Sequence, residues 1–338
     1  MANVSVWMKA LKTIPRITKE EWLNYDIIAK WLIATRSAVF IMTALASGIG
    51  GLFAFRDGEF ILSFFVAALT GLVFAHAANN LVNDLIDYKK RIDRDNYYRS
   101  QYGPQTLEHG FLSVRQFYRY ILVTLSIALG AGIYLVFNTG IITLILLVSG
   151  LFFLFFYTWP LKYIGLGEPT ILLVWGPLMV GGTYYVATGG LWPWEVALIG
   201  LVYAMGSTAV LFGKHTDKIL QDREKGVHTL PVIIGEKASR IITISLWMSQ
   251  YAILITLVVL RELGPVILVV LLALPKLNQV VNIFSKPRPL SEPDDLAPNT
   301  WPLYLSAHAF VYNRRFGMLF LAGLITEAIL DKAGIFST

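Results

Sequence analysis

The chain has 338 residues, of which 56% are hydrophobic and only 15% are charged. Its apolar runs repeatedly reach the about 20 residues that a helix needs to cross a bilayer, which excludes a soluble globular fold. The net charge of +6 does not indicate nucleic-acid binding, because the basic residues lie between the apolar runs. The absence of cysteine excludes disulfides, thiolate metal sites and thiol nucleophiles. Composition therefore predicts an all-α, polytopic membrane protein that contacts membrane lipids.

The first 26 residues lack the compact apolar core and small-residue cleavage site of a secretory signal. Residues 4–14 are amphipathic and are typical of a helix lying on the membrane surface, and Pro15 ends that segment. Thr18-Lys-Glu-Glu21 has the pattern of a capping box, which predicts the start of the next helix. We expect residues 1–26 to form an N-terminal interfacial segment.

The remaining chain predicts about nine transmembrane helices within a single domain, residues 1–338. The expected spans are residues 29–55, 60–84, 116–137, 140–158, 169–188, 194–216, 238–260, 264–284 and 314–334. Lys and Arg concentrate in three connections, 88–115, 217–237 and 285–313, and are sparse in the connections between them. Because cytoplasmic loops of membrane proteins carry excess Lys and Arg, these three loops are predicted to face the cytoplasm.

A polar and acidic stretch closes the apolar run of residues 60–78. Asn80, Asn83, Asp84 and Asp87 are spaced i, i+3, i+4 and i+7, so they share one face of a helix. Carboxylates at a helix C-terminus are unfavourable without a compensating cation. Oxygen donors without thiols suit Mg²⁺, Mn²⁺ or Ca²⁺. The alternative is an ordinary solvated helix end.

A second acidic stretch closes the span expected at residues 194–216. It contains Asp217 and Asp222, interleaved with Lys and Arg, and the topology places it on the same membrane side as the first. Two such helix ends favour a pocket for a polyanion bridged by metal. The alternative for the second stretch, taken by itself, is a charged surface loop. A five-residue separation turns the two carboxylates about 140° apart on a regular helix, so a π-bulge or a helix end between them is needed to realign them.

Several spaced motifs resemble those of the UbiA superfamily of intramembrane prenyltransferases. Asn83-x-x-x-Asp87-x-x-x-x-x-Asp93 is similar to the first Asp-rich motif in its menaquinone-branch spacing, and Asp222-Arg-Glu-x-Gly226 to the end of the second. The connection Tyr157-x-x-Pro160-x-Lys162, followed by Gly165-Leu-Gly167-Glu168, also matches in order. One departure is that Lys218 occupies the position of the first Asp in the second motif.

The resemblance implies a UbiA-like helical bundle with a central pocket open to the cytoplasmic face. It also implies an isoprenyl diphosphate donor bridged by two Mg²⁺ ions, and an aromatic or other lipid-soluble acceptor such as dihydroxynaphthoate. The metal ligands it implies are Asn83, Asp84, Asp87, Asp93, Asp217 and Asp222. The diphosphate-binding residues are Asn80, Asn83, Lys90, Arg91, Arg99, Tyr157, Lys214 and Arg223. The residues expected to act in catalysis are Asp87, Asp222, Lys162 and Arg36.

Two alternatives within the superfamily are a terpene cyclase and a prenyltransferase with a non-aromatic acceptor. A non-enzymatic transporter is a third hypothesis, which predicts ionisable residues near the membrane midplane. The acidic residues instead cluster at the ends of the expected spans, which favours the enzyme.

Overall fold

The computed structural model describes residues 3–92, 103–192, 194–294, 296 and 300–334. The secondary structure of these residues is helical, with no strand among them, so the all-α prediction is confirmed. They form two compact units, which are described separately. Unit 1 comprises residues 1–47 and 62–159, and unit 2 comprises residues 48–61 and 160–338.

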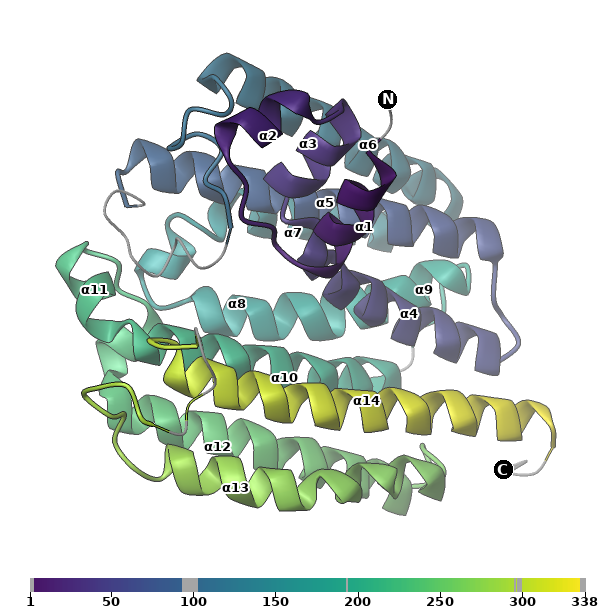
Figure 1. Cartoon of the computed structure of the whole chain (residues 1–338). Coiled ribbons are helices and arrows are strands. Elements are labelled where there is room, and N and C mark those ends of the chain that lie inside the picture. Colours follow the sequence, from purple (N-terminus) through teal and green to yellow (C-terminus); the bar gives the residue numbers. More distant parts are fainter. Residues whose placement is uncertain (1–2, 93–102, 193, 295, 297–299, 335–338) are drawn as a thin grey trace. The chain divides into compact units, whose positions relative to one another are not determined.

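Unit 1 begins with three short helices, α1 (Val4–Lys12), α2 (Lys19–Asn24) and α3 (Ile27–Ala34) (Figure 1). The predicted capping box is present, because Thr18 and Glu21 cap α2 reciprocally. Asp26 caps α3 and also accepts hydrogen bonds from the Asn3 backbone and the Trp7 indole, which ties α1 to α3. Desolvation opposes ionisation of Asp26, but these hydrogen bonds prevail and lower its pKa.

The first expected span is broken. After α3, Arg36 adopts a left-handed conformation with φ of 57° and leads into η1 (Ser37–Val39), and α4 (Phe40–Arg56) follows. Non-glycine residues rarely adopt this conformation, and it turns the chain between the two helices. The division between the units falls within α4, between Ser47 and Gly48.

The long helices of unit 1 are α5 (Leu62–Lys89), α6 (Val114–Thr139) and α7 (Ile141–Phe156). Gly140 links α6 to α7 with φ of 85°, a conformation that glycine adopts without strain. α5 packs against α6, where Gly71 lies against Ala131. A buried cluster joins these helices to the N-terminal ones, including Trp22, Leu81 and Phe117.

Unit 2 contains a helical run from Gly167 to Ala187, made of α8 (Gly167–Leu173), η4 (Val174–Gly181) and α9 (Gly182–Ala187). η4 is a π-helix containing Pro177. Proline has no backbone N–H to continue the α-helical pattern, which accounts for the change in winding. A short 3₁₀ turn, η3 (Leu161–Tyr163), precedes this run.

The rest of unit 2 is arranged around α10 (Trp194–Asp217), which packs against α12 (Leu230–Val259) and α14 (Tyr304–Lys332) (Figure 1). α11 (Ile219–Glu224) follows α10 directly, while η5 (Pro265–Ala273) and α13 (Leu274–Phe284) connect α12 to α14. The ring of Trp247 on α12 packs edge-on against Phe284 and Tyr312, so aromatic contacts join α12, α13 and α14.

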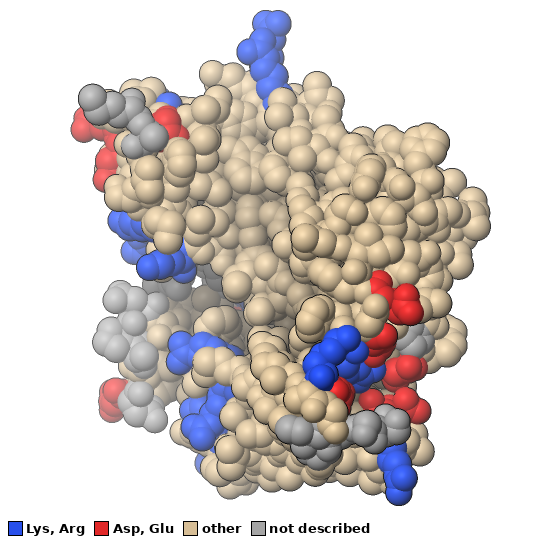
Figure 2. Space-filling model, turned by 90° about the vertical axis from the view of Figure 1, so that its right-hand side faces the viewer, with Lys and Arg blue, Asp and Glu red and all other residues tan. Residues whose placement is uncertain are grey.

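Seven helical segments in the described part of the chain are long and apolar enough to cross a membrane, and α7 is a shorter apolar helix. Each of the nine expected spans overlaps a helical segment, while the count of nine crossings stays a prediction. Large apolar side chains such as Phe137 (86% exposed) and Val259 (73%) lie on the surface. Figure 2 shows broad areas without Lys, Arg, Asp or Glu. These features are those of a multi-pass integral membrane protein.

Two of the predicted loops are shorter than expected. α11 and the start of α12 occupy much of residues 217–237, and residues 304–313, predicted as loop, form the first turns of α14. The prediction was wrong there because those turns carry polar residues, such as His308 and Asn313, that interrupt the apolar pattern. The remaining predicted loop is residues 88–115. Helix α5 continues to Lys89 at its start, and α6 begins at Val114 at its end.

Candidate functional site

The first acidic stretch lies in unit 1, on the last turns of α5. The helix continues without a break to Lys89, so Asn80, Asp84 and Asp87 have the helical spacing that the sequence predicts. Their exposed fractions are 8%, 6% and 5%. Buried carboxylates require partners or a cation, so this stretch differs from an ordinary solvated helix end.

Arg36 supplies one of these partners. Its Nη2 lies 3.1 Å from Asp84 Oδ1 and donates to the backbone oxygen of Asn80 at 3.1 Å and to Asn80 Oδ1 at 3.4 Å. The Asn80 amide donates in turn to the carbonyl of Thr35 at 2.8 Å. The left-handed turn at Arg36 is therefore fastened to α5, and a guanidinium is held against the acidic stretch.

Asn83 has a different environment. Its Oδ1 is buried and has no hydrogen-bond partner. A buried acceptor without a donor is unfavourable, and an amide oxygen among carboxylates is a suitable ligand for a hard divalent cation. This atom is the feature of the first stretch that best fits a metal ion.

The end of α5 carries two further predicted residues. The Lys90 ammonium lies 4.9 Å from the ring centre of Trp159, a cation–π contact. Arg91 is exposed and has φ of 56°, where the chain leaves the helix. Asp93 and Arg99 lie outside the described residues. Tyr157, also in unit 1, caps the end of α7 and is partly buried.

The second acidic stretch lies in unit 2. α10 ends at Asp217, Lys218 is non-helical, and α11 begins at Ile219. A helix end between the two carboxylates was one of the two expected solutions to their spacing, and it is the one observed. The two carboxylates have different partners.

Asp217 is fully engaged by protein donors. Its side chain is 0% exposed and accepts from Arg288 Nε at 3.0 Å and from the backbone N–H groups of Leu305 and Ser306 at 3.0 and 2.9 Å. Asp222, 7% exposed, has Lys218 Nζ 3.0 Å from its Oδ1, whereas its Oδ2 has no hydrogen-bond partner. Asp222 therefore keeps a carboxylate oxygen free for a ligand.

The other predicted residues of unit 2 surround this stretch in sequence. Lys214 is partly buried on the last turn of α10, and Arg223 is exposed on α11. Lys162 lies in η3, with its ammonium 5.6 Å from the ring centre of Tyr163. The segment containing Lys162 packs near the second stretch, since Ile164 pairs with His228 and Gly165 lies against Leu230.

Sequence reasoning missed a buried acid–imidazole pair. His215 Nδ1 lies 2.6 Å from Glu168 Oε1, with side-chain exposures of 6% and 1%. Glu168 Oε2 also accepts from the backbone N–H of Leu230, at the start of α12, at 3.4 Å. The pair links α8, α10 and α12. An acidic residue at the start of one helix and a histidine in the last turn of another are its only sequence signals.

The donor chemistry fits a magnesium-type cation, although no three His, Cys, Asp or Glu side chains in the described ranges are grouped as a metal site. Both stretches offer hard oxygen donors, and each contains a buried oxygen without a partner, Asn83 Oδ1 or Asp222 Oδ2. Each stretch also places a cation beside a carboxylate, which suits an anionic ligand.

Known structures share this fold. Digeranylgeranylglyceryl phosphate synthase superposes with a TM-score of 0.57 at 18% identity, covering 93% of this chain and 99% of that one. A UbiA homologue from Aeropyrum pernix K1 gives a TM-score of 0.55 at 17% identity, covering 88% and 96%. A UbiA homologue from Archaeoglobus fulgidus, bound to GPP and Mg²⁺, gives 0.50 at 16% identity, covering 86% and 99%.

Sequence relatives agree with the fold. UbiA prenyltransferase domain-containing protein 1 from Rattus norvegicus is 30% identical over 252 residues, 70% of each chain. The Homo sapiens protein of the same name is 29% identical over 248 residues, again 70% of each. The model of the UbiA prenyltransferase family matches residues 40–290. The chain therefore belongs to the UbiA prenyltransferase family and is an integral membrane enzyme of the prenyltransferase class.

Proposed function

We propose that this enzyme transfers a prenyl group from an isoprenyl diphosphate to a lipid-soluble acceptor in a Mg²⁺-dependent reaction. The observation that carries the proposal is a buried oxygen without a hydrogen-bond partner in each acidic stretch, Asn83 Oδ1 and Asp222 Oδ2. In each stretch an Arg or Lys side chain also pairs with a carboxylate, Arg36 with Asp84 and Lys218 with Asp222. The Archaeoglobus fulgidus homologues with GPP and Mg²⁺, and with DMAPP and Mg²⁺, support this choice of donor and metal.

We assign Asn83, Asp84, Asp87, Asp93 and Asp222 to metal binding, with two Mg²⁺ ions as the expected number. Bound Mg²⁺ supplies positive charge to the departing pyrophosphate. Asp217 is a weaker candidate than its neighbours, since a metal would have to displace a guanidinium and two backbone N–H groups from it.

The basic and polar residues bind the diphosphate in this proposal. They are Arg36, Asn80, Lys90, Arg91, Arg99, Tyr157, Lys162, Lys214 and Arg223. Cations directed at a leaving group stabilise the charge that develops as the C1–O bond breaks. The acceptor then forms a bond to C1 and loses a proton, and apolar helix surfaces keep water from the allylic cation.

For the acceptor, the similarity of the Asn83, Asp87 and Asp93 spacing to the menaquinone branch of the superfamily supports 1,4-dihydroxy-2-naphthoate and hence a role in quinone synthesis. An electron-rich ring is a good nucleophile toward an allylic cation. The structural similarity to digeranylgeranylglyceryl phosphate synthase supports a second candidate, a glycerol phosphate lipid. A terpene cyclase, which needs no acceptor, is the third.

A transfer assay tests the proposal. Purified protein is incubated with labelled geranylgeranyl diphosphate, Mg²⁺ and either acceptor, and both pyrophosphate and product are measured. We expect prenylated product that disappears on chelation of Mg²⁺ and in Asp87→Ala and Asp222→Ala. The exposed acid Asp294 provides a matched control, Asp294→Ala, which should retain activity.

The outcomes separate the candidates. Product with dihydroxynaphthoate alone supports the quinone role, and product with the glycerol phosphate alone overturns it. Pyrophosphate release with a cyclised hydrocarbon supports the cyclase. Absence of pyrophosphate release under every condition overturns the enzyme proposal.

We further propose that the basic loops face the cytoplasm, from the asymmetry of Lys and Arg. The chain contains no cysteine, so single cysteines can be introduced and labelled in intact cells. Lys286→Cys should resist an impermeant maleimide until the membrane is opened, whereas Arg261→Cys, in the opposite connection, should react at once. The reverse pattern would overturn the orientation.

A further inference from the structure

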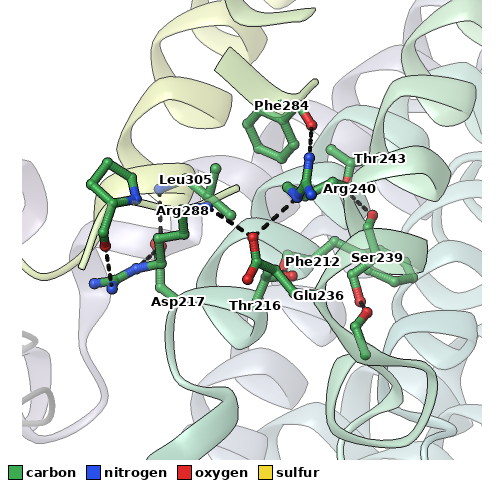
Figure 3. A network of polar contacts seen from close by, with 12 residues as sticks. Phe212, Thr216, Asp217, Glu236, Ser239, Arg240, Thr243, Phe284, Arg288 and Leu305 are labelled. Atoms are coloured by element: carbon green, nitrogen blue, oxygen red, sulfur yellow. Dashed lines mark hydrogen bonds and ion pairs between the residues drawn. The ribbon is translucent and has the colours of Figure 1, made fainter. Parts of the chain in front are cut away.

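Arg288 joins the α13–α14 connection (residues 285–303) to the second acidic stretch (Figure 3). Its guanidinium donates to Asp217 Oδ1 at 3.0 Å and to the carbonyls of Pro289 and Pro302 at 3.2 and 2.8 Å. It also stacks 4.3 Å from the ring centre of Trp301. One planar side chain thus holds both described ends of the connection and the last residue of α10, a geometry that a lysine ammonium cannot reproduce.

Asp217 also binds the first turn of α14. The residue before α14 is Leu303, which has no side-chain acceptor for the first N–H groups of the helix. Asp217 provides one from another helix, because its two oxygens accept from Leu305 and Ser306. A carboxylate at a helix N-terminus satisfies otherwise unpaired donors and is favoured by the helix dipole.

Gly213, one helical turn before Asp217, makes the approach of α14 possible. A Cβ at this position would lie 2.9 Å from the backbone nitrogen of Ser306 and 3.0 Å from the backbone carbon of Leu305. The end of α10 is therefore shaped to receive the first turn of α14 by a small residue and an acid spaced i, i+4.

A second ion pair supports the same connection from α12. The Arg288 backbone N–H donates to Glu236 Oε1 at 2.8 Å, and Glu236 pairs with Arg240 Nε at 3.1 Å. Arg240 also donates to the carbonyl of Phe284, the last residue of α13, at 2.7 Å. Glu236 follows Gly235, whose φ of 83° bends α12 at this point. The backbone of Arg288 is thus fixed as well as its side chain.

The fixed end of α10 is directly joined to the candidate ligand. Lys218 is the single residue between α10 and α11, and its carbonyl accepts from the Asp222 N–H at 2.9 Å. Its ammonium lies 3.0 Å from Asp222 Oδ1. Any tilt of the end of α10 therefore moves both the cation and the carboxylate of the second stretch.

We propose that Arg288 is a positioning residue that acts through Asp217 to hold Lys218 and Asp222 in place for the diphosphate. Asp217 is then a structural anchor and not a metal ligand. This inference rests on the proposed function, and it gives the α13–α14 connection a role that its sequence does not reveal.

The test uses Arg288→Ala, Asp217→Asn and the double variant that combines these two substitutions. Each is compared with Asp222→Asn, and Lys286→Ala is the control. Lys286 is exposed in the same connection. Activity is measured well below each variant's unfolding temperature, so that folded protein is compared. We expect Arg288→Ala and Asp217→Asn each to lower kcat by about 10- to 100-fold, since small misplacements of catalytic groups have effects of this size. The double variant should be no worse than either single variant, because both interrupt one path.

A metal titration separates anchor from ligand without measuring activity. Mn²⁺ bound to the purified protein is measured by electron paramagnetic resonance. We expect Asp217→Asn and Arg288→Ala to weaken Mn²⁺ binding equally, through the displaced support, and by less than Asp222→Asn, which loses a ligand and should bind at least about tenfold more weakly. Weakened Mn²⁺ binding in Asp217→Asn, comparable to Asp222→Asn, would make Asp217 a ligand and overturn the inference.

Hydrogen exchange tests the anchoring role of Arg288 even if the proposed enzyme activity is not found. In Arg288→Ala, amides of residues 218–224 should exchange faster, whereas Lys286→Ala should leave them unchanged. Unchanged exchange there, or parental kcat in folded Arg288→Ala, would limit Arg288 to docking the connection. If the parent protein releases no pyrophosphate, the proposed function fails, while the exchange and Mn²⁺ measurements still decide the anchoring role.

Discussion

Two glycines of α4, both within unit 2, should respond oppositely to alanine. A Cβ on Gly50 would lie 2.4 Å from the carbonyl oxygen of Val180 and 2.9 Å from the backbone nitrogen of Tyr184. A Cβ on Gly48 meets nothing within 4 Å. Both positions lie in the same helix, so intrinsic helix propensity contributes equally to the two substitutions.

Propensity alone favours alanine over glycine by about 0.5–1 kcal/mol in a helix interior. Gly48→Ala should therefore raise the free energy of unfolding by about that amount. Gly50→Ala forces backbone of η4 and α9 away from α4, and overpacking of this kind has a cost of about 1–3 kcal/mol. Because the propensity gain cancels in the comparison, the two variants should differ by the overpacking cost.

Thermal unfolding in detergent measures the difference. A change of 1 kcal/mol shifts Tm by about 2–4 °C for domains of 150–250 residues, so Gly48→Ala should unfold about 2–12 °C above Gly50→Ala. Equal Tm values for the two variants would refute the close approach of α4 to Val180. Gly50→Ser, which is also larger than glycine, should resemble Gly50→Ala.

Three further predictions concern other parts of the chain. Because the pKa of Asp26 is lowered in the folded protein, Asp26 stabilises the fold above the usual Asp pKa of about 3.9, and this contribution is lost as pH falls through the folded pKa. Amides of α1 should then exchange faster at the lower pH, and Asp26→Asn should remove this pH dependence. Trp247→Ala, at a fully buried position, should lower the free energy of unfolding by about 3–5 kcal/mol in detergent, and a loss below 1 kcal/mol would contradict the packing. Glu168→Ala and His215→Ala, measured singly and together by unfolding, should show a coupling energy of about 0.5–3 kcal/mol, and additive effects would argue against the hydrogen-bonded pair.

Much of the fold follows from local sequence patterns. The apolar runs marked the long helices, and the Thr18–Glu21 capping box placed the start of α2, because these signals act within a few residues. The helical spacing of Asn80 to Asp87 was likewise a local inference, and α5 has it.

Features that depend on contacts distant in sequence were not predictable. The break after α3 is held by Arg36 on Asp84 and Asn80, more than forty residues away, and no local pattern marks it. The first turns of α14 carry polar residues that interrupt the apolar pattern, and the group that caps this helix start, Asp217 of α10, is distant in sequence. Pro177 signalled an irregularity but not its form, a π-helical segment that keeps the run continuous.

The second acidic stretch shows why residue type alone does not assign a metal ligand. Asp217 and Asp222 are the same residue type and both are buried, so neither residue type nor burial separates an anchor from a ligand. The donors around them differ: Asp217 accepts from a guanidinium and two backbone N–H groups, while Asp222 keeps one oxygen without a partner. A cation gains from a carboxylate only the interactions that the protein has not already satisfied. We therefore propose that the helix end at Lys218 separates an anchor for α14, Asp217, from a candidate metal ligand, Asp222.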